Sequence, residues 1–208
     1  MRALVAFAVA VAVFHHAPAL AGGWSDWIDL ATPFAVVGAA AAVLVGLEAS
    51  GGVLLLALVA GIAYVDGHGL HLAANSIRNE EGLSGDADRV AYFWDEEFSH
   101  VEWHVGLLGL MLAFCLAERA WSRAPHGNLA AVVLVAVLVG FTLFTSGVEG
   151  QTWWLMPPAL AVFGWLALTR PGPVTRACAG ALALVTVLLG VWAVWHRGMP
   201  EFSELGWI

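Results

Sequence analysis

Long apolar runs alternate with short polar breaks along most of this chain. Seven apolar segments can be marked, at about residues 3–20, 30–48, 52–77, 92–120, 128–149, 151–169 and 175–196. A helix needs roughly 18 or more apolar residues to cross the hydrocarbon core of a bilayer, and most of these segments reach that length. The longest interval between them, about residues 79–91, is too short for a soluble domain. The pattern therefore predicts an all-α, polytopic integral membrane helical bundle with six or seven transmembrane helices.

The first apolar segment has two interpretations. Arg2, the apolar stretch 4–14 and the small residues Ala19 and Ala21 match the arrangement of a secretory signal peptide. The same stretch also has the character of a short first span. Residues 1–21 are therefore expected to be a signal peptide or a first transmembrane helix, and residues 22–208 a single transmembrane helical domain.

Composition supports a membrane protein and excludes several other classes. The chain is 61% hydrophobic and 12% charged, with a mean hydropathy of +0.82, whereas soluble domains are about half apolar and a quarter charged. The chain contains no lysine, which excludes Schiff-base chemistry. The net charge is −8, and nothing resembles a basic nucleic-acid patch. We therefore expect the lipid bilayer as the partner of this chain, and no nucleic acid.

The arginines predict an orientation. If the seven segments alternate across the membrane, five arginines fall on one side: Arg2, Arg119, Arg123, Arg170 and Arg176. Arginine-rich loops are typically cytoplasmic. Seven of the eight histidines then lie toward the outer ends of their helices, and only His126 lies on the inner side. We expect an integral protein of a bacterial-type inner (plasma) membrane, with its polar chemistry facing outward.

The third and fourth segments each carry a polar stripe, with spacings of three and then four residues: His68, His71 and Asn75 on one, and Glu97, His100 and His104 on the other. This spacing places side chains on one face of a helix. At about 1.5 Å of rise per residue, His68 and His104 lie roughly 22–24 Å from the inner ends of their helices, and His71 and His100 roughly 28 Å. The two helices are consecutive and antiparallel. The sequence therefore predicts that His68 faces His104 and that His71 faces His100.

Four imidazoles and a carboxylate at matched depth suit a bound transition metal. Neutral imidazole binds zinc, copper, iron and nickel, and a carboxylate balances their charge. We predict a site made of these five ligands: His68, His71, His100, His104 and Glu97. Zinc is the favoured metal, with iron and copper as alternatives. Two other interpretations of the stripes are a proton relay and a solvated helix end without a ligand.

A compact metal centre that opens outward favours metal-dependent hydrolysis of a lipid-like amide or ester. Zinc held by histidines lowers the pKa of bound water toward ~7 and polarises a carbonyl group. Glu97 or Asp66 is the expected general base. A first alternative is a di-iron or copper oxidoreductase acting on a lipid or hydrocarbon, because the Glu97-x-x-His100 spacing occurs in carboxylate-bridged di-iron bundles. A second alternative is a non-enzymatic metal-binding or transport protein.

Overall fold

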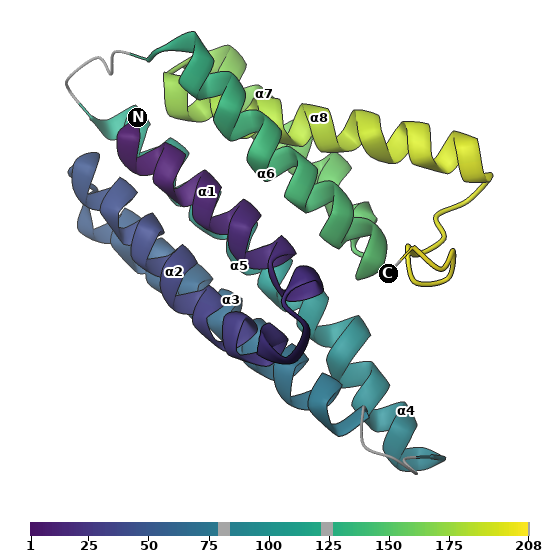
Figure 1. Cartoon of the computed structure of the whole chain (residues 1–208). Helices are drawn as coiled ribbons and strands as arrows, with labels where there is room; N and C mark the ends of the chain where they lie inside the picture. Colours follow the sequence, from purple (N-terminus) through teal and green to yellow (C-terminus); the bar gives the residue numbers. More distant parts are fainter. Residues whose placement is uncertain (79–83, 122–126, 208) are drawn as a thin grey trace.

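The computed structural model describes residues 1–78, 84–121 and 127–207 (Figure 1). It is 85% helical and has no strand in these ranges, which confirms the predicted all-α bundle. Among the described residues, five helices are long and apolar enough to cross a membrane. Two shorter apolar helices, Arg2–His16 and Trp153–Thr169, account for the remaining predicted segments.

Eight α-helices lie in the described ranges; seven correspond to the predicted apolar segments, and α4 falls in the interval predicted to lie between two of them. They are α1 (Arg2–His16), α2 (Ser25–Gly46), α3 (Gly51–Arg78), α4 (Asp86–Tyr92), α5 (Ser99–Ala120), α6 (Leu129–Glu149), α7 (Met156–Thr169) and α8 (Pro173–His196). Short 3₁₀ turns lie at η1 (Pro18–Leu20), η2 (Gly22–Trp24) and η4 (Trp153–Leu155). A π-helical turn, η3 (Phe93–Phe98), joins α4 to α5, so that residues 86–120 form one continuous rod.

Helix α1 packs inside the bundle. It contacts α2 on one side and α6 on the other, while α3 lies along α5 and α8 lies along α6 (Figure 1). Four side chains of α1 are buried: Leu4, Phe7, Ala8 and Val11. The ring of Phe7 meets the ring of Phe114 edge to face at 4.9 Å. Cleavage after residue 21 would remove this packing. Whether residues 1–21 are cleaved stays a prediction, which mass spectrometry of the mature N-terminus decides.

Two glycines let the backbones of α3 and α5 touch. A Cβ atom added to Gly67 would lie 2.6 Å from Trp103 N and 2.8 Å from Ser99 O. A Cβ atom on Gly106 would collide with the backbone of Tyr64. Small residues at such crossings are how membrane helices approach closely. The contact places α3 and α5 side by side at the end of the bundle that carries the histidines.

The opposite end of α5 is fixed to α8 by a buried carboxylate. Glu118 accepts hydrogen bonds from Val174 N (2.8 Å), Thr175 N (2.8 Å) and Thr175 Oγ1 (2.7 Å). A carboxylate at a helix N-terminus satisfies free N–H groups and interacts favourably with the helix dipole. Helix α5 is thus held at one end by α8 and at the other by α3.

The glycine contact gives a first prediction. Gly67→Ala forces the backbones of α3 and α5 apart, and overpacking of this kind costs about 1–3 kcal/mol. We expect a lower melting temperature of the detergent-solubilised protein. Gly69→Ala is the matched control, because no atom lies within 4 Å of a Cβ added there. Helix propensity alone predicts that this control is neutral or slightly stabilising. Equal melting temperatures for the two variants would contradict the close contact.

Candidate functional site

A cavity of about 650 Å³ lies at the histidine-bearing end of the bundle, between α1, α3, α5, α6 and the C-terminal segment. Among the described residues, five histidines line it: His15, His16, His68, His71 and His100. Three carboxylates also line it: Asp29, Glu96 and Glu149. We call this space the histidine cavity. His126, the one histidine predicted on the inner side, lies outside the described residues.

His71 is held by a buried ion-pair network. Its Nδ1 atom lies 2.8 Å from Asp95 Oδ1. The Asp95 side chain is fully buried and also accepts a hydrogen bond from Arg78 Nη1 at 2.9 Å. The same Arg78 atom lies 3.1 Å from Glu96 Oε1. The Asp95 carboxylate favours a proton on Nδ1, so Nε2 would offer its lone pair to a ligand once His71 is the neutral imidazole, and an ion-paired His71 would have to release a proton first.

His100 is oriented in a similar way from the neighbouring helix. Its Nδ1 atom donates to the backbone carbonyl of Glu96 at 3.0 Å, so its Nε2 also carries the lone pair. The ring centroids of His71 and His100 are 4.9 Å apart. Histidines that bind metals almost always donate their other ring N–H to a carboxylate or a backbone carbonyl. Both rings have this arrangement.

His68 is the most unusual of the histidines. Both of its ring nitrogens are buried, and neither has a hydrogen-bond partner among the described residues. Its nearest rings are those of Tyr64 (4.8 Å), His15 (5.2 Å) and Trp103 (5.2 Å). Buried polar side-chain atoms in proteins nearly always have a partner. Two unpartnered nitrogens on one ring therefore favour a ligand at this position.

His104 lies apart from His68. Its Nδ1 atom donates to His100 O at 2.6 Å, and its Nε2 atom lies 2.9 Å from Ser146 Oγ on α6. Its ring stacks on Trp103 at 3.8 Å, and the same indole lies 5.2 Å from the ring of His68. The structure thus brings His71 and His100 together, whereas His104 makes its contacts with α6. To bind a metal through Nε2, His104 would have to break its hydrogen bond with Ser146.

The π-helical turn explains which carboxylates reach the cavity. Its i→i+5 hydrogen bonds shift residues 93–98 relative to the α-helical spacing that had predicted Glu97 beside His100, and Asp95 instead faces His71 and Arg78 of α3. Asp95 is fully buried and Glu96 lines the histidine cavity, but Glu97 is exposed and lines a separate pocket. Asp66 is exposed as well, and it lies near Glu102.

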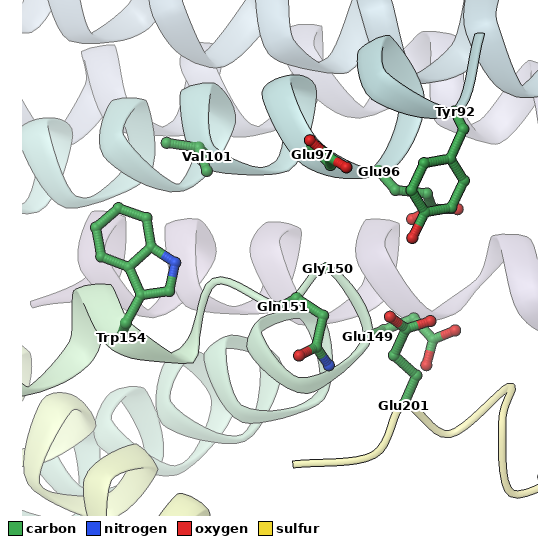
Figure 2. A pocket seen from close by; sticks show the side chains of 9 residues that line it. All are labelled: Tyr92, Glu96, Glu97, Val101, Glu149, Gly150, Gln151, Trp154 and Glu201. Atoms are coloured by element: carbon green, nitrogen blue, oxygen red, sulfur yellow. The ribbon is translucent and has the colours of Figure 1, made fainter. Parts of the chain in front are cut away.

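A second, acidic pocket of about 250 Å³ adjoins the histidine cavity. Figure 2 shows the side chains of Glu149 and Glu201 close together, with Tyr92 and Glu96 across from them. Burial and the nearby carboxylates of Glu149 and Glu204 raise the pKa of Glu201. Glu96 and Glu149 line both spaces. Carboxylates shared by the two spaces would attract cations toward the histidines.

The donor set fits a transition metal in its chemistry and in part of its geometry. In the ranges that the structure describes, no three His, Cys, Asp or Glu side chains are arranged to hold one ion as they stand. His71 and His100 supply two neighbouring imidazoles. A third donor has to come from a side-chain rotation. His68 is the candidate, because no hydrogen bond to a described residue has to break.

No protein family matches the chain, and neither the curated proteins nor the solved structures include a similar one. The chemistry of the histidine cavity is therefore the basis on which a function can be inferred. Sequence spacing selected His68, His71 and His100, placed Asp95 and Glu96 only among the nearby carboxylates, and gave no signal for Asp29. The only sequence signal for Asp95 and Glu96 is the acidic run of residues 95–97 next to His100.

The ion-pair network gives a second prediction. Asp95→Ala leaves Arg78 and His71 without their buried partner, and breaking a buried pair in this way costs roughly 3–5 kcal/mol. We expect a clear loss of melting temperature in detergent. Asp86→Ala is the control, because Asp86 forms an exposed i,i+3 pair with Arg89 and exposed pairs contribute little. An Asp95→Ala variant as stable as Asp86→Ala would show that the network does not hold α3 against the η3–α5 rod.

Proposed function

We propose that this chain is an integral membrane metalloenzyme that hydrolyses a lipid-like amide or ester in the histidine cavity, with His68, His71 and His100 as the ligands of the metal. The observation that carries the proposal is the pair of buried, unpartnered nitrogens of His68. His68 lines the same cavity as two imidazoles whose Nδ1 atoms face a carboxylate or a backbone carbonyl. Zinc is favoured because hydrolysis requires no change of oxidation state, and iron and copper are the alternatives.

The chain itself supplies orientation and proton transfer. A bound ion would activate water and polarise the carbonyl group of the substrate. Asp95 holds His71, and the backbone of Glu96 holds His100, so the two rings keep their tautomers. We assign the general base to the carboxylate of Glu96, because it lines the cavity. Glu97 and Asp66, the bases expected from spacing, line other surfaces.

The membrane setting gives the proposed reaction its direction. Five apolar helices support an integral membrane protein. The arginine distribution favours a bacterial-type inner membrane, with the histidine cavity at the outer face. The substrate would then come from the outer leaflet or from outside the cell.

The two alternative functions have less support. The di-iron interpretation depended on Glu97 and His100 acting together, but Glu97 lines the acidic pocket while His100 lines the histidine cavity. Transport requires a polar path through the bundle. Between the histidines and the inner end of α5, the buried side chains include Leu107, Leu110 and Phe114, which offer no ligand to an ion.

Metal content is the third prediction. We expect about one zinc ion per chain in the detergent-purified protein, measured by elemental analysis. His71→Ala and His100→Ala should each remove most of this metal. His196→Ala is the control, because His196 packs against Trp192 at 4.1 Å and is not part of the cavity lining. The control should keep its full metal content.

Three outcomes would decide against the proposed hydrolase. Two iron ions per chain would favour the oxidoreductase. A purified protein that takes up no zinc when zinc is added would remove the metal site. Full metal content in both His71→Ala and His100→Ala would place the metal elsewhere.

A further inference from the structure

An apolar groove of about 430 Å³ runs between α1 and α6 on the outside of the bundle. Apolar side chains from both helices line it, among them Val13, Leu20, Val137 and Phe141. These four side chains are between 47% and 88% exposed. Apart from His16 its lining is apolar, and a surface of this kind on a membrane helix is expected to face the acyl chains of the bilayer. We call it the lateral groove.

His16 joins the lateral groove to the histidine cavity. It lines both spaces. Its Nδ1 atom donates to Ala12 O at 2.7 Å, and its Nε2 atom lies 3.1 Å from Thr145 Oγ1. The ring stacks on Phe141, with centroids 5.6 Å apart. Thr145 lines the histidine cavity and Phe141 lines the groove. The contact between His16 and Thr145 is thus the boundary between an apolar and a polar space.

The charges of the histidine cavity favour a cationic ligand. Three carboxylates line the cavity, and no arginine is among its described lining residues. Arg78, the nearby cation, is engaged with Asp95 and Glu96. The lining also includes Trp207, which is 62% exposed. The face of an indole attracts ammonium groups.

We propose that the lateral groove and the histidine cavity form one binding site for an amphiphile that bears an amine or ammonium group. Its acyl chain lies between α1 and α6, and its cationic end enters the histidine cavity past His16 and Thr145. The proposal rests on the proposed function in making this cavity the reaction site, and it adds the substrate class and the route. The occupant is a lipid chain because the apolar groove meets, at His16, a polar cavity suited to a charged end, and entry of that end requires the contact between His16 and Thr145 to open.

The test uses two probes that differ in charge alone. Hexadecylamine and hexadecanoate, each with a photoreactive diazirine in the middle of the chain, are irradiated with the full-length protein in detergent. Labelled peptides are then identified by mass spectrometry. With the metal removed by a chelator, so that it cannot bind the carboxylate probe, we expect the amine to label residues 12–20 and 137–141 and the carboxylate to label them at least about fivefold less, because opposite charges reverse the sign of the interaction. Unlabelled hexadecylamine should compete with the labelling.

Two variants test whether the acyl chain of the probe binds in the lateral groove. Val137→Trp fills the lateral groove, and it should reduce labelling by the amine at least about fivefold, as overpacking of an occupied space would. Val191→Trp is the matched control, because Val191 is a 60% exposed valine on α8 that lines none of these spaces. Unchanged melting temperature and metal content would show that Val137→Trp is folded. If it misfolds, the competition measurement on the unmodified protein decides.

The outcomes separate this proposal from the hydrolase. Labelling that persists when His71→Ala and His100→Ala remove the metal supports the amphiphile site, even if no hydrolysis is found. A protein that binds metal but is not labelled in the groove overturns the amphiphile site alone. Equal labelling by both probes overturns the preference of the site for a cationic end group. Normal labelling of Val137→Trp overturns the proposal that an acyl chain occupies the lateral groove. Crosslinks to a second copy of the protein at the groove overturn it as well.

Discussion

The backbone contact between α3 and α5 at Gly67 and Gly106 is the constraint on which the site depends. Lipid tails are as apolar as leucine, so burial of apolar surface does not drive membrane helices together, and close packing has to do so. At Gly67 the backbone of α3 meets Ser99 and Trp103 directly. His68 follows Gly67, and His71 lies one turn further out. The same contact therefore brings these rings beside those of Trp103 and His100.

The buried carboxylate of Asp95 then orients a histidine that the α3–α5 contact brings into the cavity. Asp95 is fully buried and pairs with one cation and one imidazole of α3. Such a network adds little net stability compared with apolar packing, but removing one partner is costly. Its consequence here is orientation. It fixes the His71 ring, while a backbone carbonyl fixes His100. His68, the ring without any such partner, is the one that a ligand would have to satisfy.

Local patterns predicted the spans and the two stripes, because apolar length and three-four spacing are properties of single helices. The role of Asp95 could not be predicted, since a π-helical turn replaced the α-helical spacing on which Glu97 was chosen. The position of His104 depends on Ser146, which lies 42 residues away in the chain. Asp29 and His15 come from helices whose spacing bears no relation to the stripes. Contacts between helices, rather than periodicity, decided these residues.

The surroundings of the histidine cavity suggest why the site lies where it does. Hydrolysis of a membrane amphiphile needs water and an acyl chain in the same space. The acidic pocket offers a polar entrance through Glu96 and Glu149, and the lateral groove offers an apolar one at His16. The two meet at residues that can share protons or bind a cation. A site deeper in the bundle would exclude water, and a site in the loops would lie out of reach of the acyl chain of a membrane amphiphile. The histidines lie between these extremes, where both can arrive.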